Sequence, residues 1–457
     1  MIFGAVLARS MSTYRQVSHI ASWQEALLAA EAGSDTAMAE LRKTLFDPAA
    51  FSGWSTTSGG GAALPNAGST LSNAQLLHDG EGNTQLNMTV TIDAPPELKD
   101  GGGRQWYRIR STGTTFLPGA TWMTADKKDH ALRRFSFLFD RKTKQPVTRP
   151  QSSRLIELIV KPTSFENAIT SDKPMYLNNY KIVVDSYDSR DSTKSTSGLY
   201  DGAKRRMNGD IATNSRLIDA GDAHVYGDAF TNAGVIEDGA NISGEQRDDF
   251  YQELIPISKP DWPGGSGESP IEALPTIVSS SKTLAGGTKA NPKRYKLSAL
   301  TLSGSETLTI APSAAGVESY TEIWLTGDLK TTGSGTIAIQ PNANLKIFLE
   351  GSIDVKGNGT FNANSQPVRL QILGVKPAVG QTRRVDLNGN GVLVAAIYAP
   401  GHSMSLGGGG SSGLYWGSLT GNDISMGGNS QIHYDEALAD TGHVTDFRIK
   451  SWFEDNK

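Results

Sequence analysis

The chain has 457 residues, a formal net charge of −4 and no cysteine. This length allows two or three domains, each with its own apolar core. The lack of cysteine excludes disulfide bonds, thiolate metal sites and cysteine nucleophiles. The small net charge gives no general reason to expect nucleic acid or an acidic membrane as a partner.

Residues 1–46 are predicted to form one long helix. Apolar side chains recur at helical spacing, A-L-L-A-A-E-A-G follows from Ala26, and Asp47 and Pro48 end the pattern. The apolar run before Arg9 is too short to span a bilayer or to be a complete signal peptide. The helix is therefore either an ordinary amphipathic helix or the rear half of an inserted helix whose apolar front half lies upstream. In the second case the helix drives assembly through Met11, Tyr14, Val17, Ile20, Trp23, Leu27, Leu28 and Glu31.

Residues 47–84 are predicted to be an irregular connector, since Gly59–Gly61 and Pro65 interrupt any pattern. Short runs of alternating apolar residues follow, such as L-N-M-T-V-T-I from Leu86 and R-L-I-E-L-I-V from Arg154. Gly and Pro separate these runs, which favours an antiparallel β meander over residues 85–200.

Nine Lys and Arg residues lie between Lys127 and Arg154, with only two Asp residues among them. A basic stripe of this kind could hold phosphates in a salt-dependent way. Strand alternation, however, sends Arg133 and Arg134 to opposite faces. Solvated strand edges are the favoured interpretation and contact with an acidic neighbouring subunit is the alternative, so we do not expect nucleic acid as a partner.

A short phrase occurs three times between residues 300 and 361: L-T-L-S-G-S-E-T-L-T-I, L-K-T-T-G-S-G-T-I-A-I and I-D-V-K-G-N-G-T-F. Its glycines and threonines align at offsets of 29 and 24 residues. Shorter repeats with offsets of 20 and 17 residues occur from Gly401 and from Ala223. Periods near 20 residues with alternating apolar positions and glycine corners are typical of stacked β coils.

The predicted fold class is therefore mainly β with a long N-terminal helix: an antiparallel meander followed by a right-handed parallel β-helix. The first coils are placed at 201–255 and the main coils with a cap at 296–440. A Pro/Gly/Ser-rich connector at 256–295 loops outside them, and 441–457 is a tail. An antiparallel sandwich with Gly-rich turns is the alternative, although it does not explain why successive copies resemble each other.

Catalytic and metal-binding signals are weak. V-D-L-N-G-N-G-V from Val385 resembles the start of a calcium loop, but its twelfth position is Ile397 instead of the required Glu. A polysaccharide lyase or hydrolase would need carboxylates that converge on one face. The coils offer Asp328, Asp354, Asp386 and Asp423, but an offset of 24 aligns Asp328 with Ser352.

Two further groups remain as candidates. His433, Asp435 and Glu436 could form an acid–base cluster, yet capping of the open end of the coils is the favoured role. An adhesin would need an exposed aromatic platform for glycan, with Tyr398, Tyr415 and Trp416 as candidates. Aromatic residues in alternating strands more often pack under a loop.

Three stretches resemble type IV pilin-like proteins of the PilX type. They are S-H-I-A-S-W-Q-E-A-L-L-A-A-E-A-G-S-D-T-A-M-A-E-L from Ser18, the segment from Tyr187 to Arg206, and S-Q-I-H-Y-D-E-A-L from Ser430. The resemblance implies a helix buried in a filament core, a β-helical C-terminal region and contact with the inner membrane before assembly. One feature departs from the pilin pattern, because Ala5 stands where a Glu is usual.

We therefore expect a structural subunit of an extracellular, pilus-like filament on the cell surface. Its partners would be copies of itself or other pilins. We expect no enzymatic activity, cofactor or metal. The alternatives are a minor or tip pilin acting as an adhesin or glycan-binding β-helix, and a polysaccharide lyase or hydrolase.

Overall fold

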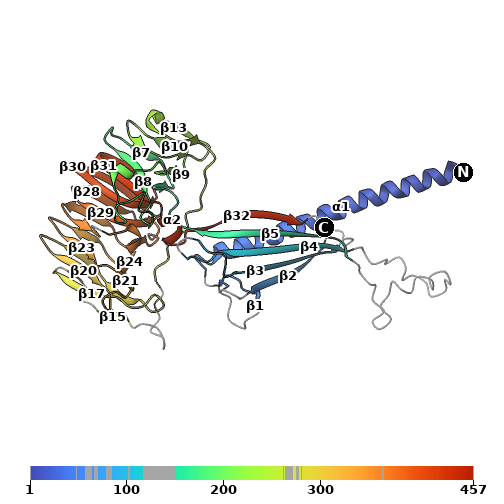
Figure 1. Cartoon of the computed structure of the whole chain (residues 1–457), viewed down its shortest axis with the longest axis horizontal. Coiled ribbons are helices and arrows are strands. Elements are labelled where there is room, and N and C mark those ends of the chain that lie inside the picture. Colours follow the sequence, from blue (N-terminus) through green and yellow to red (C-terminus); the bar gives the residue numbers. More distant parts are fainter. Residues whose placement is uncertain are drawn as a thin grey trace. The chain divides into compact units, whose positions relative to one another are not determined.

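The computed structural model describes residues 2–47, 49–56, 64–65, 70–78, 85–100, 103–116, 150–260, 262, 271–273, 277–278, 280–362 and 365–455. The chain is mainly β and divides into two compact units (Figure 1). Unit 1 comprises Met1–Pro162 and Phe447–Lys457, and unit 2 comprises Thr163–Asp446.

Unit 1 begins with the long helix α1 (Ile2–Lys43), which confirms the predicted N-terminal helix. Arg42 and Lys43 lie in its last turn, where positive charge is favourable beside the C-terminal end of the helix dipole. The helix rests on a six-stranded sheet whose strand order is β1-β2-β3-β4-β5-β32. The strands are β1 (Ser55–Thr56), β2 (Thr70–His78), β3 (Gln85–Asp93), β4 (Tyr107–Phe116), β5 (Pro150–Thr163) and β32 (Asp446–Asp455).

The first five strands pair antiparallel, which confirms a meander but moves its end from residue 200 to Thr163. The run R-R-F-S-F-L-F-D from Arg133, which has the alternation of a further meander strand, lies outside the described residues. So does all of the basic stretch except Arg154. The segment 441–457 is not a free tail as predicted, because β32 within it pairs with β5 in the sheet. A tail can join a sheet in this way because it completes the hydrogen bonding of an open edge.

Small side chains let α1 lie close to the sheet. Gly113 of β4 is so near the helix that an added Cβ would lie 2.0 Å from the carbonyl oxygen of Ala26. Gly33 of the helix faces Ser111 and Met88 in the same way. We call the side of α1 that faces the sheet the buried face; its members are almost fully buried and are Ala26, Ala29, Ala30, Gly33 and Ala37.

Unit 2 is a large parallel sheet in which, from β15 to β26, each strand pairs with the strand three positions later in the chain. This spacing produces three continuous ladders, each built from one strand of every successive trio. Ladder A contains β15 (Ile271–Ala273), β18 (Lys293–Leu297), β21 (Ser319–Leu325), β24 (Ala343–Leu349) and β27 (Leu370–Gly374). Ladder B contains β16 (Ile277–Val278), β19 (Ala299–Leu302), β22 (Leu329–Thr331), β25 (Ile353–Gly357) and β28 (Arg383–Gly389). Ladder C contains β17 (Lys282–Ala285), β20 (Thr307–Ala311), β23 (Thr336–Ile339), β26 (Thr360–Phe361) and the start of β29 (Val392–Ala399).

Residues that the sequence repeat aligns are paired with each other in these ladders. Leu300 pairs with Leu329 and Leu329 with Ile353, while Thr307 pairs with Thr336 and Thr336 with Thr360. The parallel pairing excludes the antiparallel sandwich for this part of the chain. The aligned glycines Gly304, Gly333 and Gly357 have φ values of 56°, 69° and 83°, which a side chain would disfavour.

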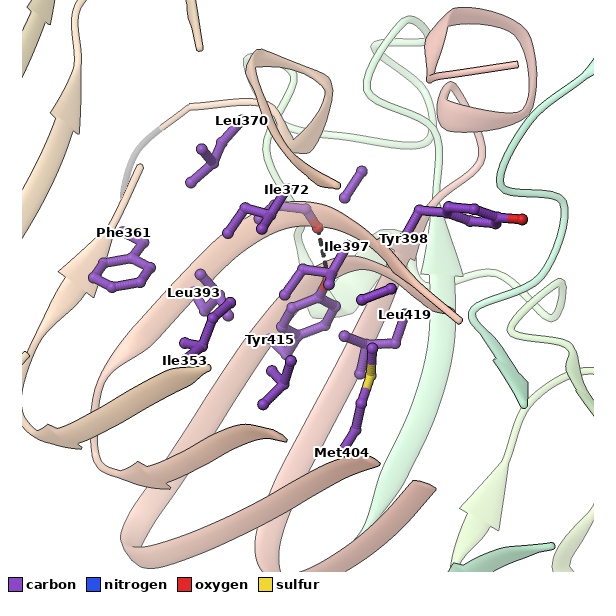
Figure 2. Packing of buried hydrophobic residues seen from close by; sticks show 14 of the residues in the cluster. Ile353, Phe361, Leu370, Ile372, Leu393, Ile397, Tyr398, Met404, Tyr415 and Leu419 are labelled. Carbon is purple, nitrogen blue, oxygen red and sulfur yellow. Dashed lines mark hydrogen bonds between the residues drawn. The ribbon is translucent and has the colours of Figure 1, made fainter. Parts of the chain in front are cut away.

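Alternate residues of each strand point into a shared core. In β21 and β24 every second residue is buried, as expected for strands with one covered face. Figure 2 shows part of this core, where apolar side chains from successive strands of ladders A, B and C pack together.

The chain enters the parallel sheet near its middle instead of at an end. The first trio, β6 (Ile169–Ser171), β7 (Met175–Leu177) and β8 (Val183–Tyr187), is paired on one side with β9 (Ile211–Thr213), β10 (Leu217–Asp219) and β11 (His224–Val225). On its other side lie the last strands of the sheet, β30 (His402–Gly421) and β31 (Ile424–Asp435). We call the pairing of the first trio with β30 and β31 the seam; in Figure 1, β31 lies beside β7 and β8 within unit 2. The predicted capping role of His433 and Asp435 at an open end of the coils is therefore wrong, because β31 is paired on both sides.

Beyond β11 the chain adds β12 (Ala229–Phe230), β13 (Val235–Glu237) and β14 (Gln246–Arg247), and then crosses to the far end of the sheet at β15. The predicted connector at 256–295 is wrong in its second half, since β15, β16 and β17 already belong to the ladders. In its first half, Ile257 pairs in parallel with Val375, directly after β27 of ladder A. There Trp262 packs edge-on against Trp324 and Phe348, with ring centroids 5.9 and 6.1 Å apart.

Candidate functional site

The predicted assembly residues lie on α1, and three of them are strongly exposed. Val17, Ile20 and Leu28 have exposed fractions of 60%, 57% and 63%. Leu27 and Glu31 are half-buried, and the side chains of Met11 and Tyr14 lie outside the described residues. We call Val17, Ile20 and Leu28 the apolar strip.

The apolar strip lies on the side of α1 that faces away from the sheet. At about 100° of rotation per residue, its members fall within about 80° of one another. The centre of the strip is about 170° around the helix from the centre of the buried face. Leu28 is thus on the outward side of the docked part of the helix, whereas Val17 and Ile20 precede that part, where Gln16 and His19 are exposed as well.

Trp23 has a partner within unit 1. Its ring lies 4.0 Å from the guanidinium carbon of Arg154 of β5, and Arg154 also forms an ion pair with Glu454 of β32. The side chain of Arg154 is only 1% exposed, so its charge requires such partners. Trp23 is 38% exposed and is in part a structural residue instead of a free assembly contact.

The predicted aromatic platform is contradicted. Tyr398 and Tyr415 are 2% and 3% exposed, and their hydroxyls donate to the carbonyl oxygens of Ile255 and Ala395 at 2.9 and 2.7 Å. Figure 2 shows Tyr415 pointing into the core cluster. Burial raises the pKa of both phenols. Both faces of β29 are covered, and Trp416 is half-buried beside Tyr200, so these residues offer no exposed stacking surface.

The seam brings together the two later stretches that the sequence singled out. Asp185 of β8 lies opposite His433 of β31, with 2.6 Å between Asp185 Oδ1 and His433 Nδ1. The hydroxyl of Tyr200 donates to Asp185 Oδ2 at 2.7 Å, and its ring stacks on that of His433 at 3.6 Å. Burial and this carboxylate raise the pKa of Tyr200. Sequence reasoning could not see this contact, because the partners are 248 residues apart.

A second layer of polar contacts surrounds this pair. Glu436 accepts hydrogen bonds from Arg206, Asn208 and Ser186 at 2.8, 2.8 and 2.9 Å. Arg190 bonds to Asp188 and to Asp440. Burial acts to raise the pKa of Asp188, but the hydrogen bonds from Arg190 outweigh it and lower that pKa.

Asp435 is the unusual member of the seam. Its Oδ1 accepts from the backbone N–H groups of Ser189 and Ala437, while Oδ2 is buried and has no hydrogen-bond partner among the described residues. Burial raises the pKa of Asp435 to about 6. The predicted cluster of His433, Asp435 and Glu436 thus lies in a buried network that joins the first and last strands of the parallel sheet.

The carboxylates proposed for an enzyme lie on ladder B or beside it. Asp354 and Asp386 are register partners, whereas Asp328 bonds to the backbone of Ser352, as the offset of 24 predicts. The aligned pair is paired with cations, because Lys356 bonds to Asp354 at 2.8 Å and Arg384 lies 3.4 Å from Asp386. The calcium-like segment forms β28 instead of a loop.

His402 is buried in the core. Its Nε2 lies 3.1 Å from the carbonyl oxygen of Gly351, and burial lowers the pKa of His402 to about 4. Within the described ranges, no three metal-ligating side chains come together. Likewise, none of the helices in the described part of the chain is long and apolar enough to cross a membrane.

One comparison with known proteins gives a match. Residues 275–441 match a family model described as a domain of unknown function (DUF7305). The matched part runs from β16 to the short helix α2 (Leu438–Thr441) and carries no stated activity. No curated protein matches the chain, and no solved structure matches it.

Proposed function

We propose that this chain is a structural subunit of a pilus-like filament on the cell surface, assembling with copies of itself or with other pilins. The observation that carries the proposal is the apolar strip of α1. The helix docks on its own sheet by one side and exposes Val17, Ile20 and Leu28 on the other, where the exposed Gln24 and Asp35 also lie. These three apolar side chains have no partner in the described part of the chain. A second copy of the same helix would cover that side.

Burial of the strip is large enough to matter. Full burial of a Val, Ile or Leu side chain contributes about 1.5–3 kcal/mol relative to leaving it exposed. One helix pair would bury only part of this area. A repeating, non-closing interface gives each helix several neighbours, so contributions from both sides of each subunit add along a filament.

Within this proposal, unit 2 is a right-handed parallel β-helix that faces outward from the filament. The three ladders and the match between repeat and register support the β-helix. Stacked strands of this kind form a stiff body that lengthens by adding trios of strands.

The proposal predicts that charge on the apolar strip prevents assembly. At a protein concentration on the order of tens of micromolar, the purified full chain is expected to sediment as oligomers or filaments, because this concentration exceeds a dissociation constant of about 1 μM. The triple variant V17D/I20D/L28D should sediment as a monomer, because three carboxylates would have to be desolvated at the interface. Sedimentation velocity and negative-stain electron microscopy measure the outcome.

A matched control places three Asp residues on exposed positions of α1 outside the strip, at Gln16, His19 and Ala32. This Q16D/H19D/A32D variant should assemble like the wild type, since it carries a similar cost in helix propensity. The proposal fails if wild type and strip variant have the same sedimentation profile, or if the control loses assembly to the same extent.

A further inference from the structure

A groove in unit 2 has an unusual distribution of charge. It lies where the crossing segment at 256–259 meets the turn between β27 and β28, and its volume is about 450 Å³. Cavities of this size are in the range of small-molecule sites. Three cationic side chains, Lys259, Lys376 and Arg383, line it, together with one carboxylate, Glu350.

The cations form no close ion pairs, although Arg383 lies near enough to Asp328 to help lower the pKa of that carboxyl. In the described residues, none of Lys259, Lys376 and Arg383 forms an ion pair with a carboxylate. Arg383 donates from Nη2 to Gln381 at 2.8 Å, but its Nε is buried and has no acceptor in that same part of the chain. Lys259 and Lys376 are exposed, so their ammonium groups can donate charge-assisted hydrogen bonds to an oxyanion bound in the groove.

The rest of the lining is suited to a sugar. Pro256, Val375 and Pro377 give apolar walls, while Ser258 and Gln381 can donate to or accept from hydroxyl groups. Glu350 adds an acceptor, and its Oε1 is held by the indole N–H of Trp324 at 2.6 Å. A saccharide presents both donors and acceptors around an apolar ring face, and such a mixed lining matches it.

A peptide fits less well. An extended peptide would bind by adding a strand to a free backbone edge. Here the edge is occupied, because Lys376 N–H donates to the carbonyl oxygen of Ile257 and Val375 N–H to that of Leu349, both at 2.8 Å. The side chains alone would have to hold a peptide.

From these features we propose that the groove lined by Lys259, Lys376 and Arg383 binds an acidic saccharide, with a sugar carboxylate on the cations and sugar hydroxyls on Gln381 and Glu350. This function is separate from assembly through α1, so each proposal can fail without the other.

The test is isothermal titration calorimetry of the full chain with trigalacturonate, at low salt and at 150 mM salt. Trigalacturonate should bind saturably, and its methyl ester, which lacks the charges, should bind at least tenfold more weakly. The K259Q/K376Q variant should also bind trigalacturonate at least tenfold more weakly. Both lysines are exposed, so their loss leaves the core intact. The K99Q/K289Q variant, which removes two exposed lysines elsewhere, should bind like the wild type.

Absence of saturable binding would overturn the proposal, as would an equal loss in K99Q/K289Q, which would indicate diffuse charge attraction. Triglutamate serves as the peptide probe. If triglutamate binds as tightly as trigalacturonate and is equally sensitive to K259Q/K376Q, the assignment to a saccharide is wrong.

Discussion

Replacement of Asp435 by asparagine is expected to remove the share of this carboxyl in a loss of stability that the wild-type chain suffers as the pH rises from about 4 to 7. Burial raises the pKa of this carboxyl from 3.8 to about 6. Between these two values the native state holds a proton that the unfolded state has released, so the free energy of unfolding falls as pH rises through the window. A shift of about two units corresponds to about 3 kcal/mol. The D435N variant cannot ionise and should escape this loss.

The measurement is urea unfolding of the full chain at several pH values, with the difference between wild type and D435N as the readout. The difference is needed because other groups titrate nearby: burial also raises the pKa of Asp210 to about 6, whereas the pKa of Asp188 is lowered. Asparagine keeps the acceptor that Ser189 and Ala437 use. The exposed Asp222 gives the control D222N, which should follow the wild type at every pH. A difference between wild type and D435N that stays constant from pH 4 to 7.5 would show that folding does not raise the pKa of Asp435, and would contradict the prediction.

The register of the ladders could be predicted from the sequence, residue by residue. Each layer of the core must accept the side chain of the layer before it, so Leu300, Leu329 and Ile353 recur at the same place. Glycine recurs for a similar reason. Gly333 and Gly357 approach the preceding layer so closely that an added Cβ would lie within 3.4 Å of its backbone. Because each layer packs on a layer only about 20–30 residues away, the packing requirement is visible as a repeat in the sequence.

The position of β6, β7 and β8 in the middle of the parallel sheet could not be predicted from a sequence repeat. β6, β7 and β8 have three to five residues each and alternate poorly, so they resembled the end of the meander. Their partners in β30 and β31 lie about 250 residues further along the chain. A short stretch of sequence does not distinguish a loop from a strand whose partner is far away in the chain. For this reason the predicted end of the meander at residue 200 is wrong.

The prediction of an exposed aromatic platform is wrong for a related reason. Alternation predicts which residues of a strand share a face, but not whether a distant segment covers the outer face. Tyr398 packs edge-on against Phe165, with ring centroids 6.3 Å apart, and bonds to the backbone of Ile255. Both partners come from segments far from β29 in sequence. The groove with Lys259, Lys376 and Arg383 was missed in the same way, because it is formed by two loops that meet only in the folded chain.

Substitution of Gly113 by valine is expected to release α1 from the sheet of unit 1. A Cβ at this position would lie 2.0 Å from the carbonyl oxygen of Ala26 and 2.6 Å from the backbone nitrogen of Ala30. Both atoms belong to the helix backbone, so no side-chain rotation can relieve the clash and the helix must move outward. Overpacking against a rigid element typically costs about 1–3 kcal/mol and sometimes more. Because the clash involves helix backbone, we expect the upper end of this range.

Hydrogen exchange with mass spectrometry of the full chain locates the effect. Peptides from Ala26 to Leu41 should exchange about 100-fold faster in G113V, since each 1.4 kcal/mol is a factor of ten. Peptides from β21 and β24 of unit 2 should be unchanged. T112V, whose side chain points away from the helix on the same strand, is the matched control. The same variant links the fold to the proposed function, because a released helix no longer holds Val17, Ile20 and Leu28 in a fixed position for a second copy. If α1 keeps its wild-type protection in G113V, the close contact between Gly113 and Ala26 does not hold the helix, and the apolar strip needs another anchor.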